Sequence, residues 1–388
     1  MSLQIEKTEV SSYHGNPNLK PVGYTHEWTK EQIAEYMKCA DDPIYFIENY
    51  CQIVTLDKGL QPFKLYDCQK RKVDFIMNNR RCILMEGRQQ GKTVTAAACI
   101  LHYIIFQDSK TVAIMANKSN AAREVLSRLQ IMYENLPLWM QQGVKTWNKG
   151  DVELENGSRV FTAATTSSGI RGKSVNWLYI DEAAIIPNNV ADEFFTSVYP
   201  TISAGETTKI LLTSTPLGYN HFWKFWNESE KGKNGFKNMF IHYSEIPGRD
   251  DVWAEQQLQL LGELKYNQEV LCEFLGSSNT LINGKTLAVL SSKEPEYFKD
   301  GLSIYQEPEK DKYYVISADV ARGIGGDYSA FVVVDVTAMP YTVVAKYKHN
   351  KISPLLYPNI LDKVGRDYNN AFIMVESNDI GQQVLDIL

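Results

Sequence analysis

The chain has 388 residues, which is enough for two domains that each bury a hydrophobic core. Its formal net charge of −6 argues against a protein coated with cations for passive DNA binding, although it is compatible with a local basic groove. The six cysteines form no C-x-x-C pair and the six histidines form no metal-ligand cluster, so we expect buried free thiols in a reducing compartment and no zinc module.

The chain carries no sign of membrane insertion. No apolar stretch reaches the roughly 18 to 20 residues of a membrane-spanning helix, and the N-terminus lacks the apolar core of a signal peptide. We therefore expect a soluble, cytosolic protein with no membrane partner. Residues 1–28 are polar and rich in Ser, Asn, Pro and Gly, which predicts a flexible tail, and Thr29 and Gln32 then form a capping box that opens the first helix.

Apolar strands alternate with helical stretches between residue 29 and about residue 215. The expected strands are 82–85, 111–115, 175–180 and 209–213, and the expected helices are 94–106, 119–135 and 190–199. Such alternation predicts an α/β domain with a parallel sheet covered on both faces. We place this domain at 29–276. A Gly-Ser-Ser-Asn segment and a charged run mark a junction at 277–312, and a second domain follows at 313–388.

A glycine-bounded loop stands between the first strand and its helix, and it reads Gly87, Arg88, Gln89, Gln90, Gly91, Lys92, Thr93. The backbone N–H groups of such a loop point at a polyphosphate, and the following helix adds its positive N-terminal end. Lys92 and Thr93 can reach the terminal phosphates and Mg²⁺. We therefore expect ATP and Mg²⁺ to bind here. One departure is that the usual first glycine of such loops falls at Glu86, whereas the glycine in this chain is Gly87.

Two carboxylates complete this candidate site at the end of the strand 175–180. Asp181 would hold Mg²⁺ through water, and Glu182 would orient and deprotonate the water that attacks ATP. The alternative is a solvated acidic turn after a strand. The phosphate loop earlier in the chain favours the catalytic interpretation.

Other side chains could sense the nucleotide. Three hydroxyls, on Thr213, Ser214 and Thr215, follow the strand 209–213 and could respond to the γ-phosphate, or they could simply cap a turn closed by Pro216. The Gln69 amide can both donate to and accept from an adenine edge, although a surface glutamine is the default interpretation.

The segment 220–240 interleaves aromatic residues with lysines. A stacking platform for nucleic acid has this composition, and so does an amphipathic helix packed on the ATPase core. We favour the amphipathic helix.

A second group of carboxylates follows the junction. Asp319 lies on an expected strand at 313–320, and a glycine-rich loop leads from it to Asp327. Two strands (330–336 and 341–348), a helix (354–368) and a strand (371–375) that ends in Glu376 complete the domain. If its first and fourth strands are neighbours, Asp319 and Glu376 lie side by side and could hold Mg²⁺ or Mn²⁺ in a clamp that cuts phosphodiesters. The alternative for each acid is ordinary surface charge.

Taken together, these motifs resemble the large terminase subunit of tailed bacteriophages with contractile tails, an ATP-driven motor that packages viral DNA. The resemblance extends from about Asp42 to the last residue. Its most specific parts are the loop arginine Arg88, the Tyr-Ile-Asp-Glu-Ala strand end at 179–183, the hydroxyl triplet before Pro216, and Ala-Asp-Val-Ala-Arg-Gly-x-Gly-Gly-Asp-Tyr at 318–328.

The resemblance implies a P-loop NTPase with a RecA-like parallel sheet, followed by a partial RNase H-like nuclease domain. It implies adenine contact at Gln69, nucleotide contacts along the loop 87–93, and coupling through 213–215. It further implies transition-state stabilisation by Arg88, a role for Arg171 before the Asp-Glu strand, and a helper role for Asp327 beside the metal ligands Asp319 and Glu376.

The implied partners are double-stranded DNA, the portal protein of the procapsid, the small terminase subunit, and further copies of the chain in a ring on the portal. The implied location is the cytoplasm of the infected bacterium. The family's nuclease has a further acidic ligand and a fifth strand beyond Leu388. We therefore expect this chain to hydrolyse ATP and to leave plasmid DNA uncut.

Two other functions compete with a packaging motor. A DNA helicase would carry a second RecA-like domain after Thr215, whereas the next motifs here are Asp319, Asp327 and Glu376. A structural docking subunit that holds a nucleotide without hydrolysis would have no need of Glu182, which favours an enzyme.

Overall fold

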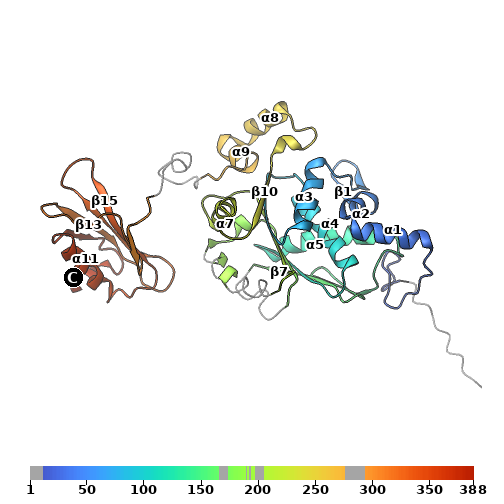
Figure 1. Cartoon of the computed structure of the whole chain (residues 1–388), viewed down its shortest axis with the longest axis horizontal. Coiled ribbons are helices and arrows are strands. Elements are labelled where there is room, and N and C mark those ends of the chain that lie inside the picture. Colours follow the sequence, from blue (N-terminus) through green and yellow to red (C-terminus); the bar gives the residue numbers. More distant parts are fainter. Residues whose placement is uncertain (1–11, 166–173, 189, 192–193, 197–204, 276–292) are drawn as a thin grey trace, which may run out of the picture. The chain divides into compact units, whose positions relative to one another are not determined.

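The structure is a computed structural model of the chain, and it describes residues 12–165, 174–188, 190–191, 194–196, 205–275 and 293–388. It divides into two compact units, Met1–Ala288 and Val289–Leu388, each of which is described by itself (Figure 1). Half of the expected helix 190–199 lies outside the described residues, and the described half, 190–191 and 194–196, is helical. Within the described part of the chain, no helix combines the length and apolarity needed to span a bilayer.

The first unit is built on an eight-stranded mixed sheet. Six strands are parallel, in the order β10 (Lys237–Ile241), β3 (Arg81–Glu86), β9 (Lys209–Ser214), β8 (Trp177–Ile180), β4 (Thr111–Ala116) and β7 (Arg159–Ala164). Two further strands, β6 (Asp151–Leu154) and β5 (Val144–Trp147), extend the sheet in antiparallel pairing. The predicted α/β sheet is confirmed, and its antiparallel edge is an addition that the sequence interpretation missed.

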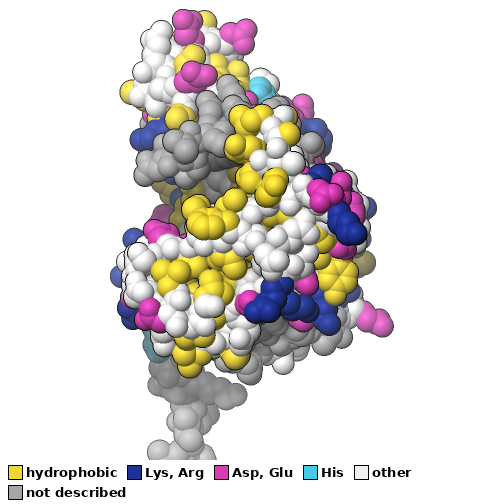
Figure 2. Space-filling view, turned by 90° about the vertical axis from the view of Figure 1, so that its left-hand side faces the viewer, with side chains coloured by type: hydrophobic (Ala, Val, Ile, Leu, Met, Phe, Trp, Pro, Cys, Tyr) yellow, Lys and Arg dark blue, Asp and Glu magenta, His cyan; other side chains and the backbone are white. Residues whose placement is uncertain are grey.

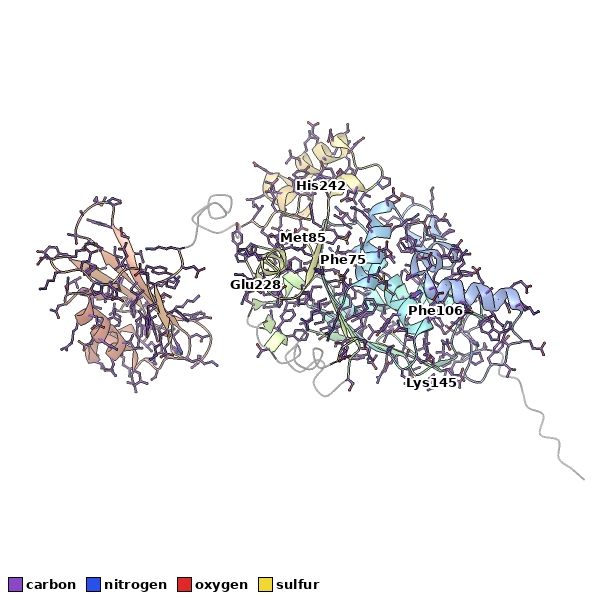
Figure 3. The ribbon with its side chains drawn as sticks, in the orientation of Figure 1. Phe75, Met85, Phe106, Lys145, Glu228 and His242 are labelled. Carbon is purple, nitrogen blue, oxygen red and sulfur yellow. The ribbon has the colours of Figure 1, made fainter. Side chains whose placement is uncertain are left out.

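The parallel strands are apolar on both sides because helices cover both faces of the sheet. Along β3, Cys82 and Leu84 belong to one buried cluster, whereas Ile83 and Met85 belong to the other. Phe75 on α3 (Asp67–Asn78) packs against the first cluster, and Figure 3 labels it together with Met85. The strand therefore separates two hydrophobic layers, and its carboxyl end delivers the phosphate loop to the edge of the sheet.

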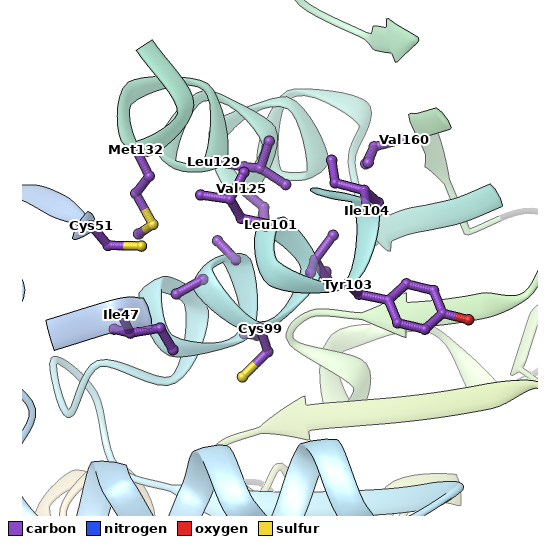
Figure 4. Close-up of a cluster of buried hydrophobic side chains, with 14 of the residues drawn as sticks. Ile47, Cys51, Cys99, Leu101, Tyr103, Ile104, Val125, Leu129, Met132 and Val160 are labelled. Atoms are coloured by element: carbon purple, nitrogen blue, oxygen red, sulfur yellow. The ribbon is translucent and has the colours of Figure 1, made fainter. Parts of the chain in front are cut away.

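The larger layer is centred on α4 (Lys92–Phe106), which follows the phosphate loop. Figure 4 shows its residues Cys99, Leu101 and Ile104 among side chains of α2 (Pro43–Tyr50) and α5 (Ser119–Glu134). A helix that is apolar on nearly all sides is stable only when it is enclosed. Burial of α4 thus fixes the direction in which its N-terminus points, and with it the position of the loop.

Smaller elements lie around these two layers. Phe222 and Trp226 anchor α7 (His221–Glu230) in the second cluster, so the amphipathic helix favoured from the sequence is confirmed. The helices α8 (Asp251–Leu261) and α9 (Glu263–Glu269) form their own small apolar group with Tyr243. A short hairpin, β1 (Gln52–Thr55) and β2 (Gly59–Pro62), follows α2.

The prediction of a flexible tail over residues 1–28 is wrong for residues 12–28, and residues 1–11 lie outside the described part. Leu19 is buried in the main core, and the Val144 N–H donates to the Lys20 carbonyl over 2.8 Å. The segment is polar, but a single buried leucine and these backbone bonds attach it to β5. The capping box of Thr29 and Gln32 opens α1 (Lys30–Asp41) as predicted.

The described part of the second unit, residues 293–388, contains a six-stranded sheet and two helices. Its strand order is β11 (Tyr297–Lys299), β12 (Leu302–Ile304), β15 (Thr342–His349), β14 (Ser329–Asp335), β13 (Tyr314–Asp319) and β16 (Phe372–Val375). The pairing of β13 with β16 is parallel, as the carboxylate argument requires. The helices α11 (Tyr357–Asp367) and α12 (Gly381–Ile387) share one core with Ile316 and Phe331.

All six cysteines of the chain are buried free thiols, as expected.

Candidate functional site

The phosphate loop is held in a conformation that depends on glycine. Gly91 has φ +82°, and a Cβ there would lie 2.5 Å from the Gln69 Nε2 atom. Gln89 also takes a left-handed φ of 58°. Glycine is favoured at Gly91 because it adopts a positive φ without strain and because a Cβ there would collide with Gln69. The loop is therefore shaped by its own backbone, and α4 begins directly after it at Lys92.

Asp181 accepts hydrogen bonds from residues at the start of α4 and at the end of β9. The Thr93 hydroxyl donates to its Oδ2 atom over 3.0 Å, and the Thr213 hydroxyl donates to its Oδ1 atom over 2.8 Å. Asp181 is itself largely buried. The first helical turn after the loop, the end of β8 and the end of β9 thus meet at one carboxylate, as expected where parallel strands finish at a common edge.

Glu182 and Lys92 form an ion pair, with 2.9 Å between Nζ and Oε1. The Lys92 side chain is only 7% exposed, whereas that of Glu182 is 34% exposed. Glu182 also has φ 52°, a left-handed conformation that is strained for a glutamate and typical of functional positions. A phosphate group would compete with this carboxylate for Lys92 and leave Glu182 able to approach a water molecule.

The three hydroxyls at the end of β9 make different contacts. Thr213 is bonded to Asp181 and lies 3.2 Å from the Tyr179 hydroxyl, while the Ser214 hydroxyl accepts from the Ala184 N–H over 3.1 Å. Thr215 is buried. Two of the three hydroxyls therefore tie β9 to the segment that carries Asp181 and Glu182, which is a physical route from this strand to the site.

Gln69 lies against the phosphate loop. Its Oε1 atom accepts from the Tyr66 N–H over 3.0 Å at the start of α3, and its Nε2 atom faces Gly91. Gln69 is 5% exposed, so it is not the surface glutamine of the default interpretation.

A buried ion pair beneath the loop was missed by the sequence interpretation. Lys72 Nζ lies 2.7 and 2.9 Å from the carboxylate oxygens of Glu86, and both side chains are fully buried. The same ammonium lies 3.4 Å from the Gln90 carbonyl. Burial raises the pKa of Glu86, and the Lys72 charge opposes that shift. Glu86 stands where other phosphate loops have glycine, and Lys72 explains how a carboxylate is tolerated there.

Lys72 could have been found from its spacing. Gln69, Lys72, Val73 and Ile76 are the i, i+3, i+4 and i+7 positions of α3, and all are buried. A lysine on the apolar stripe of a helix requires a buried partner.

Arg88 contacts the α8–α9 segment. Its Nε atom lies 2.7 Å from the Glu269 carboxylate, which raises the pKa of the guanidinium, and its side chain is 69% exposed. Arg249 donates to the Gln89 carbonyl over 2.7 Å and to the Arg88 carbonyl over 3.3 Å. Neither Glu269 nor Arg249 belongs to a recognisable motif, so sequence inspection missed both. Arg171 lies outside the described residues.

In the second unit, Asp319 and Glu376 come to neighbouring strand ends. Ala318 pairs with Val375 in the parallel ladder, and the Glu376 N–H donates to the Ala318 carbonyl over 2.9 Å. Both acids are exposed, and each is the next residue along its strand. Asp327 is exposed in the loop before β14, and within the described residues no group of three His, Cys, Asp or Glu side chains has the geometry of a metal site.

Comparison with known proteins agrees with this arrangement. The family described as "Terminase large subunit, T4likevirus-type, N-terminal" matches residues 83–289, more than half of the 388 residues, and the "Terminase RNaseH-like domain" matches residues 316–388. The chain belongs to the large terminase subunits. Its fold is accordingly an ATPase domain on a mixed sheet followed by an RNase H-like nuclease domain, in agreement with the predicted fold class.

Two curated relatives are large terminase subunits of Thermus phages. The G20c protein is 25% identical over 342 residues, 80% of this chain and 68% of the relative. The P23-45 protein is 25% identical over 241 residues, 58% of this chain and 47% of the relative. The chain thus spans about two thirds of one relative and about half of the other.

Solved structures include the HK97 bacteriophage large terminase, which is 14% identical with a TM-score of 0.54, over 86% of this chain and 74% of that one. This similarity shows a shared fold. The large terminase of the thermophilic bacteriophage D6E, solved in complex with ATP-gamma-S, is 12% identical with a TM-score of 0.44, over 84% of this chain and 80% of that one.

The buried pair beneath the loop gives a stability prediction. Lys72→Met leaves the Glu86 carboxylate buried without its partner, so we expect the free energy of unfolding to fall by about 3–5 kcal/mol in chemical denaturation. The double variant Lys72→Met/Glu86→Leu removes both charges and should recover most of that loss. Lys70→Met breaks a surface pair with Glu48 and should cost less than about 1 kcal/mol. An equal loss in Lys70→Met and Lys72→Met would contradict the assignment.

Proposed function

We propose that the first unit hydrolyses ATP to drive movement of double-stranded DNA into a procapsid. The observation that carries the proposal is the convergence of Lys92, Thr93, Asp181 and Glu182 at one edge of the sheet. Two hydroxyl–carboxylate bonds at Asp181 and the 2.9 Å ion pair of Lys92 with Glu182 hold these groups together. Family membership supports the same conclusion.

The residues present fit a nucleotide with its Mg²⁺. Apart from the Arg88 N–H, which donates to the Glu269 carbonyl, the loop 87–91 would offer backbone N–H groups, and the N-terminus of α4 adds its positive end. Thr93 and Asp181, already bonded to each other, are the oxygen ligands of the type that Mg²⁺ takes in such sites. Bound Mg²⁺ would neutralise charge on the β- and γ-phosphates.

Hydrolysis would begin with a change of partner at Lys92. The ammonium binds the phosphates, which frees the Glu182 carboxylate to accept a proton from the attacking water. Thr213 holds Asp181 from the other side, so loss of the γ-phosphate can be transmitted to β9 through this bond. Gln69 lies against the loop on the side of α3 and would contact the adenine.

Arg88 is proposed to stabilise the transition state from within its own subunit. Arg88 is an exposed residue of the phosphate loop, so its guanidinium would approach the γ-phosphate once it leaves Glu269, and its planar fork suits phosphate oxygens.

The second unit is proposed to supply two metal-binding carboxylates to an endonuclease that cuts concatemeric DNA. Asp319 and Glu376 stand at adjacent ends of parallel strands, and one or two carboxylates together with substrate phosphates are a usual ligand set for Mg²⁺. Asp327 is proposed as a helper on its glycine-rich loop. The implied partners are DNA, the portal protein, the small terminase subunit and other copies of the chain, in the cytoplasm of an infected bacterium. The contractile-tail assignment stays a prediction.

Neither a helicase nor a docking subunit accounts for the residues of both units as well as a packaging motor does. A helicase would need a second motor domain, whereas residues 316–388 match an RNase H-like domain. A docking subunit without hydrolysis would not require Glu182 in a strained conformation beside Lys92.

Two substitutions separate binding from chemistry. Lys92→Ala removes a charge from the phosphates and should weaken ATP binding, whereas Glu182→Gln is nearly isosteric and should leave ATP bound but uncleaved. Each should lower the steady-state ATPase rate by at least ~10²-fold. Nucleotide affinity is measured in parallel with a fluorescent ATP analogue. Turnover within tenfold of wild type in Glu182→Gln would assign the base elsewhere.

Arg88→Lys tests the loop arginine. Lysine keeps the charge and can still pair with Glu269, but it lacks the planar fork, so turnover should fall by on the order of 10³-fold with little change in ATP affinity. If affinity and turnover fall together, Arg88 is a binding residue only.

The nuclease assignment is tested by metal binding without nucleotide. Isothermal titration with Mn²⁺ should detect a site that is lost in Asp319→Asn and in Glu376→Gln, while the ATPase rate stays at the wild-type level. Unchanged Mn²⁺ binding in both variants would remove these carboxylates from the proposed site.

A further inference from the structure

The open face of the second unit's sheet carries two lysines beside the carboxylates. Asp319 pairs with Ala330 across β13 and β14, and Ala330 pairs with Lys348 across β14 and β15. Directly paired residues point to the same face of a sheet. Asp319 and Lys348 therefore lie in one row, separated by the small side chain of Ala330.

A second row runs parallel to the first. Ser317 pairs with Val332, and Val332 pairs with Lys346. The alternating residues Ile316, Phe331 and Tyr347 are buried on the opposite face in the core with α11. Lys346 and Lys348 are thus fixed by strand register on the same exposed face as Asp319. Val375 pairs with the buried Ala318, so the next residue, Glu376, lies on the exposed face.

These rows line one hollow. A cavity of about 600 Å³ is bounded at one side by Asp319 and Glu376 and at the other by Lys346 and Lys348, with Ala330 and Val332 of β14 between them. At about 4.8 Å per strand, Asp319 and Lys348 are separated by roughly 10 Å at the backbone. The hollow is therefore wide enough for more than one group of an extended ligand.

Neither lysine is neutralised by a neighbouring acid. Among the described residues, no carboxylate lies within salt-bridge distance of either ammonium. The Lys348 Nζ atom instead lies 4.1 Å from the centre of the Tyr328 ring, and Lys346 Nζ lies 5.4 Å from that of Tyr305. A ring face holds an ammonium in place without cancelling its charge, so both cations remain able to bind an anion.

The hollow has two carboxylates on one side and two ammonium groups on the other, and this arrangement favours one class of ligand. An acidic peptide would be attracted by Lys346 and Lys348 but repelled by Asp319 and Glu376. A phosphodiester backbone meets both requirements, because one phosphate can share a divalent cation with the carboxylates while the next binds the lysines. Figure 2 shows acidic, basic and hydrophobic side chains interspersed on the face that it presents, consistent with local basic sites on an acidic chain.

We propose that Lys346 and Lys348 bind the DNA backbone beside the scissile phosphate and so position the strand across Asp319 and Glu376. They are positioning residues, because the reacting phosphate would lie at the carboxylates. This inference rests on the proposed nuclease function of the second unit, and it adds the direction of the bound strand, which runs across the strands of the sheet from β16 and β13 towards β15.

The test is the salt dependence of DNA binding by the full chain. A fluorescein-labelled duplex is titrated in Ca²⁺ at several salt concentrations, and affinity is read from anisotropy. Each lysine that neutralises a phosphate contributes about 0.9 to the slope of log K against log salt. Lys346→Gln/Lys348→Gln should lower that slope by about 2 and reduce affinity at low salt at least tenfold.

The matched control is Lys310→Gln/Lys363→Gln, which removes the same charge from exposed lysines of the same unit; Lys363 lies on α11, away from the open face. The control should keep the wild-type slope. An unchanged slope in the Lys346/Lys348 variant, or an equal drop in the control, overturns the proposal. The Mn²⁺ titration of Asp319→Asn separates the two claims: a metal site that depends on Asp319 together with an unchanged slope leaves the nuclease standing and removes only the lysines.

Discussion

The Asp181 carboxylate is the contact on which the candidate nucleotide site depends. It accepts from Thr93 at the start of α4 and from Thr213 at the end of β9, while its own strand lies between β9 and β4. Charge-assisted bonds to a buried carboxylate are stronger than neutral ones, and each would be costly to leave unmade. The phosphate loop, the strand that carries Asp181 and the candidate coupling strand β9 are therefore held in one geometry by a single side chain.

A second constraint is the buried ion pair beneath the phosphate loop. Lys72 and Glu86 connect α3 to the end of β3, and Lys72 also reaches the Gln90 carbonyl. Gln69, one turn earlier on the same helix, lies against Gly91. Side-chain contacts thus connect the helix that would face the adenine to the loop that would face the phosphates. A buried pair of this kind is weak support for stability, and its best-attested use is to specify one arrangement.

Much of this architecture could be predicted because the relevant signals are local. An apolar run followed by Gly-x-x-x-Gly-Lys-Thr specifies a strand, a loop and a helix, and β3 and α4 have the predicted limits to within two residues. The last four strands of the second unit keep the predicted β-β-β-α-β order, and β13 and β16 are neighbours. The prediction of a junction at 277–312 missed β11 and β12, which add two strands to the same sheet. Side chains at the ends of parallel strands, such as Asp181 and Thr213, then meet of necessity.

The parts that could not be predicted depend on contacts distant in sequence. Glu269 and Arg249 reach the loop from α9 and from the start of α8, and nothing near them in the sequence marks a partner 160 or more residues away. Strands β5 and β6 are short and half polar, so their place at the sheet edge follows only from pairing with β7. The lysines on β15 read as ordinary surface charge until register sets them opposite Asp319.

The N-terminal segment has a consequence for the sheet edge. The Lys20 carbonyl accepts from Val144, and Pro21 forms an isolated bridge with the same residue, so this segment shields part of the outermost strand β5. An uncovered edge strand offers unpaired backbone groups to other chains. Proline has no backbone N–H to donate, so it interrupts such pairing. A shortened protein that begins at α1 would keep every residue of the nucleotide site, yet it would expose a surface on which copies of the chain can add to one another as strands.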